Sequence, residues 1–141
     1  MALMNSNALK QPMKNYKKHL LDRLTNNSIM ICEIGDSICH HPIGKFMIDQ
    51  LIRSGTASSL LYAESLSAES VKDLIHKLSL VLKELRETKT NLTILSGITL
   101  SVRTLHLIEF SHGETDELIA QISRGLFTLK KNHRDHSSGK S

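Results

Sequence analysis

Residues 67–95 read SAESVKDLIHKLSLVLKELRETKTNLTIL, and this stretch decides the fold class. Its apolar residues recur every three or four positions over roughly seven helical turns, while Lys, Glu and Arg fill the remaining face. The apolar stripe comprises Val71, Leu74, Ile75, Leu78, Val81, Leu82, Leu85, Leu92 and Leu95. The pattern predicts a long helix over 68–96 that buries one face against other helices.

Both ends of this predicted helix carry capping signals. Ser67 or Ser70 can cap the N-terminus, and Asp73 follows Ser70 at the spacing of a capping box. Asp73 and Lys77 stand at i,i+4, where an ion pair contributes only about 0.3 kcal/mol. The leucine stripe is therefore the main stabilising feature, and Gly97 is expected to end the helix.

A second helix is predicted over 42–65. Pro42 suits the first turn of a helix, and apolar residues recur behind it at helical spacing. The run SGTASS at 54–59 lowers helix propensity by itself. We therefore expect another helix backbone to lie close against this run.

The apolar periodicity is weaker in the sequence before these two predicted helices. Residues 27–41 fit a helical face that starts after a break at Asn26-Asn27-Ser28, although 29–38 would also suit a short buried strand. Residues 1–26 are expected to form a flexible basic segment that is partly helical.

The chain after the pair is expected to contain one more long helix. Residues 101–109 form a turn or short helix, and His112-Gly113 marks a break. The last helix covers 114–131, with Thr115 as its cap. Residues 133–141 have nothing to bury and are expected to be a disordered basic tail.

Composition agrees with a single helical domain. The chain has 141 residues, and its 22 leucines against three phenylalanines, two tyrosines and no tryptophan favour helices over sheets. We predict an all-α fold, an up-and-down antiparallel four-helix bundle over 27–132.

The cysteine count and hydropathy suggest a compartment. Cys32 and Cys39 are too few for a disulfide framework, so both are expected to be reduced. Their i,i+7 spacing places them on a buried or half-buried helix face rather than in a zinc site.

No run reaches the roughly 18 apolar residues of a membrane span, and the N-terminal residues do not resemble a secretory signal. We expect a cytoplasmic protein that does not associate with membranes.

Metal chemistry finds little support in the sequence. Four-helix bundles can hold di-iron centres through Glu-x-x-His motifs. Asp73-x-x-His76 has Asp in place of Glu, and Glu109-x-x-His112 lies beside the predicted helix break. We expect no metal and no cofactor.

One tripeptide resembles an esterase motif. Gly35-Asp36-Ser37 would need a strand-to-helix turn that exposes the serine, and a distal Asp-x-x-His to supply the base. The candidate for that pair, Asp73 to His76, lies within the strongest predicted helix. We therefore expect no enzyme.

Charge is distributed unevenly along the chain. The net charge is +4 and the pI about 9.2, but residues 1–24 and 121–141 each carry +4 while residues 25–120 sum to −4. The cations that could bind nucleic acid on the bundle are Arg53, Lys72, Lys77, Lys83, Arg86, Lys130 and Lys131. With only five aromatic residues, we expect binding to phosphates without base selectivity.

The alternative for these charges is an ordinary solvated surface with structural ion pairs. Arg53 and Glu64 are eleven residues apart, about three turns, so they point the same way from one helix. The expected structural ion-pair anchors are Arg53, Glu64, Asp73, Glu84 and Glu87.

Three segments resemble a known family. They are QLIRSG at 50–55 followed by Glu64, SVKDLIHKLSLVLKELRET at 70–88, and DELIAQISRGLFTLKKN at 116–132. They look like the four-helix-bundle proteins first met as products of intervening sequences in bacterial 23S ribosomal RNA genes. Matching positions are Arg53, Ser54, Glu64, Asp73, Lys77, Lys83, Glu84 and Glu87. Where many members carry an aromatic residue late in the third helix, this chain has Asn91.

The resemblance implies a function class as well as a fold. Members assemble as homopentameric rings, and a related branch, the accessory variability determinant of diversity-generating retroelements, partners a reverse transcriptase and nucleic acid. No catalytic residues are known for the family. We therefore expect a non-enzymatic, oligomeric protein that associates with nucleic acid, most of all with RNA. We expect it to assist a reverse transcriptase or another RNA-handling enzyme. The alternative is a structural or regulatory protein-interaction module that binds no nucleic acid.

Overall fold

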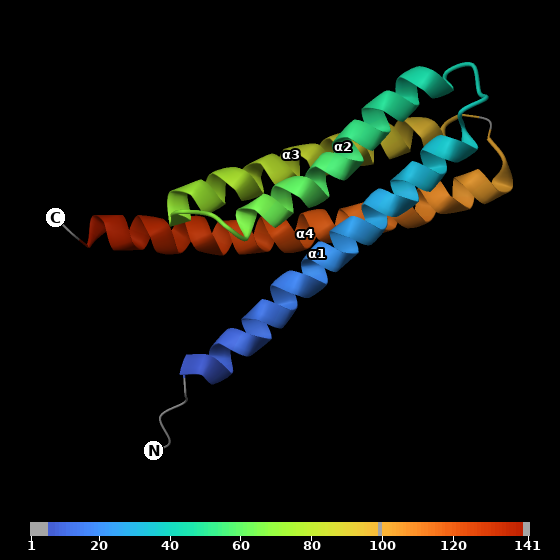
Figure 1. Ribbon diagram of the computed structural model, residues 1–141. Coiled ribbons are helices and arrows are strands. Elements are labelled where there is room, and N and C mark those ends of the chain that lie inside the picture. Colours follow the sequence, from blue (N-terminus) through green and yellow to red (C-terminus); the bar gives the residue numbers. More distant parts are fainter. Residues whose placement is uncertain (1–5, 99, 140–141) are drawn as a thin grey trace.

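The computed structural model describes residues 6–98 and 100–139, which form four helices. These are α1 (Ser6–Ser37), α2 (Gly44–Ser65), α3 (Val71–Ser96) and α4 (Val102–Ser138). Each helix packs against two neighbours in the ring α1–α2–α3–α4, and within the described residues no Cα atoms of a diagonal helix pair lie within 8 Å of each other. The fold is the predicted all-α, up-and-down antiparallel four-helix bundle (Figure 1). The predictions for residues 1–5 and 140–141 lie outside the described residues.

The third helix ends at the predicted residue, Ser96, and begins at Val71, three residues later than predicted, after the second of the two candidate caps. Ser70 Oγ accepts a hydrogen bond from the Asp73 backbone N–H at 3.0 Å. The Asp73 carboxylate accepts from the Glu69 N–H at 3.1 Å, and both of its oxygens lie 2.8 Å from Lys77 Nζ. Gly97 is the C-terminal cap. Local chemistry alone thus places the ends of α3.

The first helix differs from the prediction. α1 is helical from Ser6 and runs unbroken through Asn26, Asn27 and Ser28, so the predicted break is wrong, and the segment expected to be partly helical is helical from Ser6 onwards. Asn27 and Ser28 are only 4% and 7% exposed, and their side chains bond to α4 and α2 instead of capping α1. Tertiary contacts therefore override the turn preference of these residues.

The last helix differs in the same way. α4 is continuous, so the break at His112-Gly113 is wrong, and the disordered tail expected after it is helical as far as Ser138. A Cβ added at Gly113 would meet nothing within 4 Å, so this glycine lies on an open helix face. Thr115 does not cap a helix, because its hydroxyl donates to the Ser111 carbonyl at 2.7 Å.

Two apolar clusters fill the bundle, one towards each end. The loop-end cluster, beside the α1–α2 and α3–α4 connections, consists of Ile31, Ile34, Ile38, Met47, Leu51, Leu92, Leu95 and Ile108. The terminal-end cluster, on the side of both chain termini, consists of Leu20, Leu24, Tyr62, Leu78, Val81, Leu82, Leu85, Leu118, Ile122 and Leu126. Every helix contributes to both clusters.

A layer of buried polar side chains separates the two clusters. This polar layer consists of Asn27, Ser28, Ser54, Ser58, Thr88, Asn91, Ser111 and Thr115. Asn27 Nδ2 donates to Thr115 Oγ1 at 2.9 Å, and Ser111 Oγ donates to Asn27 Oδ1 at 2.8 Å. Within the described residues, no buried side-chain nitrogen or oxygen lacks a partner. The layer can therefore be buried without an unpaired polar group.

The small-residue run of α2 packs closely against α1, as predicted. A Cβ added at Gly55 would approach Ile31 Cδ1 to 2.5 Å. The Gly55 carbonyl also accepts a hydrogen bond from Ser28 Oγ at 2.8 Å. Pro42, however, lies in the connection before α2 and not in its first turn, which begins at Gly44.

The cysteines lie outside the core. Cys32 and Cys39 are both free and exposed, so the prediction of a buried or half-buried face is wrong. The reason is that Ile31, Ile34 and Ile38 occupy the inward stripe of this part of the chain. Within the described residues, no helix combines the length and apolar character needed to cross a membrane.

The N-terminal part of α1 leaves the bundle at the terminal end (Figure 1). No described side chain of α1 before Leu20 is buried. The divergence opens a groove of about 530 Å³, here called the terminal-end groove, between α1 and the ends of the other helices. Its apolar lining includes Met13, Tyr16, Leu20, Tyr62, Leu66, Leu74, Leu78, Ile122 and Leu129.

Candidate functional site

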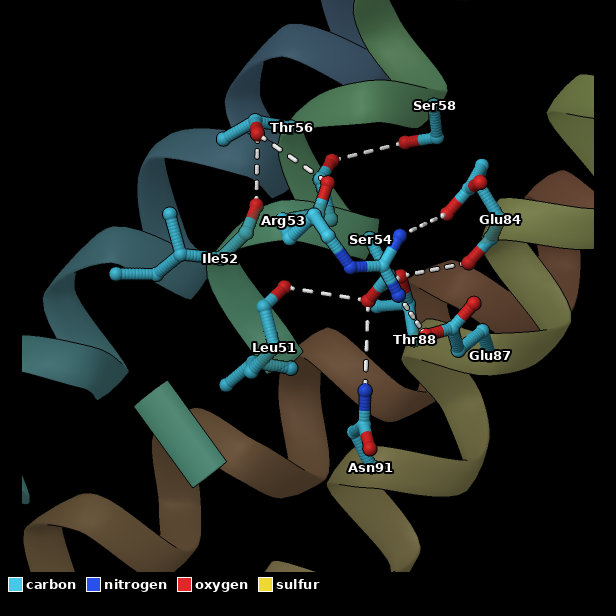
Figure 2. Close-up of polar contacts among 11 residues, drawn as sticks. Leu51, Ile52, Arg53, Ser54, Thr56, Ser58, Glu84, Glu87, Thr88 and Asn91 are labelled. Atoms are coloured by element: carbon cyan, nitrogen blue, oxygen red, sulfur yellow. Dashed lines mark hydrogen bonds and ion pairs between the residues drawn. The ribbon is translucent and has the colours of Figure 1, made fainter. Parts of the chain in front are cut away.

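A polar contact joins α2 to α3 through Arg53 (Figure 2). The Arg53 guanidinium lies 3.4 Å from Glu84 Oε2 and forms a second ion pair with Glu87. Its side chain remains 50% exposed. Two carboxylates thus offset the charge of Arg53, which makes it a helix-joining residue rather than a free phosphate ligand.

Directly behind this ion pair lies the α2–α3 part of the polar layer. Ser54 Oγ accepts hydrogen bonds from Thr88 Oγ1 at 3.0 Å and from Asn91 Nδ2 at 3.4 Å (Figure 2). It donates to the Leu51 carbonyl at 3.3 Å. The position of Asn91, where the resembling family often has an aromatic ring, is therefore used for a buried hydrogen bond.

Two more cations of the third helix are paired. Lys77 is held by both carboxylate oxygens of Asp73, and this hydrogen bond lowers the pKa of Asp73 below its ordinary value. Lys89 lies 2.5 Å from Asp116 of α4, which likewise lowers the pKa of Asp116. The fifth expected anchor, Glu64, is exposed and makes no ion pair with any described residue.

Other cations lie along the outer seam between α3 and α4. Two adjoining hollows there, of about 350 and 500 Å³, share Lys130 as a wall residue. We name them together the basic groove, and its charged or aromatic lining consists of Lys72, Arg86, Phe127, Lys130, His133 and Arg134. No Asp or Glu lines either hollow. Within the described residues, none of its lysines or arginines makes an ion pair.

The basic groove contains three of the seven cations predicted from sequence and adds residues that the sequence did not reveal. Lys83 and Lys131 are exposed but line neither hollow. Phe127, Lys130 and Arg134 share one face of α4 because they are spaced by three and four residues. That spacing was visible in the sequence, but it carries meaning only once α4 is known to continue past residue 132.

The N-terminal half of α4 borders an acidic hollow. A hollow of about 570 Å³ there is lined by Glu109, Glu114 and Glu117, with the exposed ring of Phe110 among them. Arg23 of α1 donates to both Glu114 oxygens, at 2.7 and 3.0 Å, and to Glu117 at 2.8 Å. The Glu114 hydrogen bond is the main cause of the raised pKa of Arg23. The hollow beside residues 106–117 of α4 and the basic groove beside residues 123–134 therefore differ in the sign of their charged side chains.

One titratable group belongs to the terminal-end groove. Tyr62 is 5% exposed, and burial raises its pKa to about 12, with a smaller contribution from Tyr16. The phenol is therefore neutral at physiological pH and contributes mainly its apolar ring to the groove.

The motifs considered for metal or esterase chemistry have other surroundings. Asp73 bonds Lys77 and not His76, and His112 lies 3.1 Å from the Thr93 hydroxyl. Ser37 is the last residue of α1, where its hydroxyl donates to the Ile34 carbonyl at 2.7 Å. Within the described residues, no group of three or more His, Cys, Asp or Glu is placed to hold a metal ion.

No protein-family model matches the sequence, and the search of curated proteins found no relative. Among solved structures, the fold is similar to that of a protein of unknown function from the S23 ribosomal protein family of Bacteroides thetaiotaomicron VPI-5482. The TM-score is 0.68 at 23% sequence identity, over 78% of this chain and 96% of that chain. The similarity shows a shared four-helix fold and is compatible with the family resemblance of the three sequence segments.

Proposed function

We propose that this protein is a non-enzymatic helical bundle that associates with nucleic acid, with RNA as its main ligand. The observation that carries the proposal is the basic groove, where Lys72, Arg86, Lys130 and Arg134 lie together and make no ion pair with any carboxylate of residues 6–98 and 100–139. Cations that are not neutralised within the protein are the ones that can replace the counterions of a phosphate backbone. Elsewhere on the bundle Arg53, Lys77 and Lys89 have carboxylate partners, so these three cations are less available to a ligand than those of the groove.

The proposal includes assembly with other chains. The family resemblance favours a homopentamer, in which the +4 of each chain would sum to about +20 and strengthen the attraction to nucleic acid. Exposed apolar side chains such as Phe46, Leu60 and Phe110 offer contact area for copies or partners. The resemblance also favours a reverse transcriptase or another RNA-handling enzyme as a partner. The two free, exposed cysteines suit a reducing compartment such as the cytoplasm.

A salt titration tests nucleic-acid binding. We expect structured RNA and duplex DNA to bind at about 50 mM salt and to weaken steeply towards about 200 mM, because each phosphate contact releases counterions. Absence of binding even at low salt would refute the proposal. Light scattering on the same sample tests assembly, since a monomer has a mass of 15.8 kDa.

Two deletions separate the basic ends from the basic groove. Deleting residues 1–14 removes Lys10 and Lys14, and deleting residues 133–141 removes Arg134 and Lys140 against Asp135. We expect the second deletion to weaken binding and flatten its salt slope more per charge lost, because Arg134 lines the groove. Equal effects per charge would indicate that the ends act only through net charge.

A protein-interaction module is the second candidate, and a different observation favours it. The terminal-end groove is largely apolar, and Met13 and Tyr16 on its rim are 62% and 54% exposed. Apolar surface of this kind is commonly covered by another protein. If the salt titration shows no nucleic-acid binding, this candidate becomes the better account.

A further inference from the structure

The geometry of the basic groove points to single-stranded nucleic acid as its ligand, with one base stacked on Phe127 and the neighbouring phosphates held by Arg86 and Lys130. This inference rests on the proposed function and names the substrate class of the same site. It also replaces the expectation, from the small number of aromatic residues, that binding would involve phosphates alone.

Phe127 is an apolar ring that the core does not use. It is 67% exposed, whereas Leu82 and Leu126 beside it in the same hollow are 4% and 6% exposed and belong to the terminal-end cluster. The two leucines therefore form an apolar floor, and Phe127 stands at its edge. A ring in this position gives a planar surface on which a nucleobase can stack.

The cations lie where the adjoining phosphates would pass. Lys130 follows Phe127 by three residues, a rise of about 4.5 Å along α4, and Arg86 faces them from α3 in the same hollow. Lys130 also borders the second hollow, which continues the groove to Lys72 and Arg134. From Arg86 to Lys72 the groove extends about 21 Å along α3, enough for several nucleotides. A stacking ring beside a row of cations is the arrangement that non-selective single-strand binders use.

A duplex would not use this arrangement fully. The bases of a double helix are stacked on one another, so a side-chain ring reaches a base face only where the strand is unpaired. The hollow around Phe127, about 350 Å³, is at the small end of the roughly 300–1,000 Å³ of ligand pockets. Its neutral polar side chains are the hydroxyls of Ser79 and Ser123, which can pair with any base edge. We therefore expect a preference for single strands with little preference for base identity.

The same helix provides a matched control. Phe110 is 65% exposed, almost the same as Phe127, but it lies among Glu109, Glu114 and Glu117. The rings of Phe110 and Phe127 thus expose similar fractions of their surface, but Phe110 is surrounded by carboxylates and Phe127 by cations. Arg103, an exposed cation of α4 that lines neither hollow, is the matching control for Lys130.

The first experiment measures binding of a fluorescently labelled oligo(U) RNA and of an RNA duplex of equal length by anisotropy. Loss of one stacked base corresponds to about a 5- to 150-fold weakening, so we expect Phe127→Ala to lose at least fivefold on oligo(U) and much less on the duplex. Phe110→Ala should match the wild type on both. Lys130→Ala should weaken both ligands and reduce the single-strand salt slope by about 0.7, whereas Arg103→Ala should not.

The second experiment reads the stacking directly. The chain has no tryptophan, so Phe127→Trp introduces the only indole, and Phe110→Trp places the same probe in the acidic hollow. We expect oligo(U) to quench the emission of the first variant and not of the second. Because both rings are exposed, thermal unfolding of all variants should match the wild type, which confirms that they fold.

The outcomes distinguish the inference from the proposed function. If Lys130→Ala weakens binding while Phe127→Ala does not, or if the duplex binds as tightly as oligo(U), the single-strand inference is wrong and the proposed function stands. If neither ligand binds the wild type at low salt, both fail.

Discussion

The two ends of the bundle are built from similar residues and packed to different degrees. In the loop-end cluster Ile31, Ile34, Leu51, Leu92 and Leu95 are completely buried, and all four helices remain together. In the terminal-end cluster several members keep some exposure, and α1 diverges there to open the terminal-end groove (Figure 1). From this difference we expect the loop end to contribute more to stability, and the terminal end to present more accessible surface.

The polar layer marks the boundary between these two ends. Its hydrogen bonds join α1 to α4 through Asn27, α1 to α2 through Ser28, and α2 to α3 through Ser54. Apolar contacts have no preferred direction, whereas hydrogen bonds do. The polar layer can therefore fix the register of helices whose apolar stripes alone would tolerate a shift. Both the basic groove and the terminal-end groove then lie on the side where packing is less complete.

The largest expected effect tests whether the loop end is the stable end. Leu95→Ala removes a completely buried side chain, and we expect it to lower the free energy of unfolding by about 2–5 kcal/mol. Leu78→Ala should cost less, because Leu78 lies against the terminal-end groove and is 8% exposed. Urea unfolding measures both. Equal losses would mean that the two ends are equally well packed.

The next effect concerns the boundary between them. Asn27→Ala leaves the Ser111 hydroxyl without its buried acceptor, and we expect a loss of about 1–3 kcal/mol in the free energy of unfolding. A triple variant, Asn27→Leu with Ser111→Ala and Thr115→Val, removes all the partners together and should be nearly neutral by the same measurement. A triple variant as unstable as Asn27→Ala would show that the cost comes from packing and not from an unpaired group.

A smaller change in stability is expected from removing either of the two arginine ion pairs. Arg23 joins α1 to α4 with three hydrogen bonds and is 19% exposed, whereas Arg53 joins α2 to α3 and is 50% exposed. We expect Arg23→Gln to cost about 1.5–3 kcal/mol and Arg53→Gln about 0–1 kcal/mol, because exposed ion pairs are screened by water. Thermal unfolding at low and high salt checks this, and the reverse order would contradict it.

The smallest effect is the pH dependence of the paired carboxylates. Lys77 lowers the folded-state pKa of Asp73 below its ordinary value of 3.8, and Lys89 does the same for Asp116. A lowered carboxyl pKa adds stability above pH 3.8 that is lost as the pH falls through the folded-state pKa. The stability difference between the wild type and Asp116→Asn should therefore be present at pH 7 and shrink below pH 3.8. A difference that stays constant with pH would show that Asp116 acts through packing.

Much of the fold follows from the sequence by local rules. The 3.6-residue periodicity identified the four-helix bundle, and the local signals at Ser70 and Gly97 placed the ends of α3. The same rules failed at Asn26–Ser28 and at His112-Gly113, which favour turns but lie within α1 and α4. They failed because side chains such as Asn27 and Ser28, which could cap a helix locally, instead bond to other helices in the polar layer.

The candidate site depended on tertiary structure to a greater extent. Composition gives the number of cations on the bundle, and helical spacing indicates which face of its helix each one occupies. The sequence placed Arg53, Glu84 and Glu87 among the expected ion-pair anchors, and the structure pairs them. That Arg86 and Lys130 make no ion pair with any described residue follows from the arrangement of the helices alone. Exposed charges are screened from one another beyond about 10 Å at physiological ionic strength, so the charge available to a ligand depends on neighbours that are close in space and can lie far away in sequence.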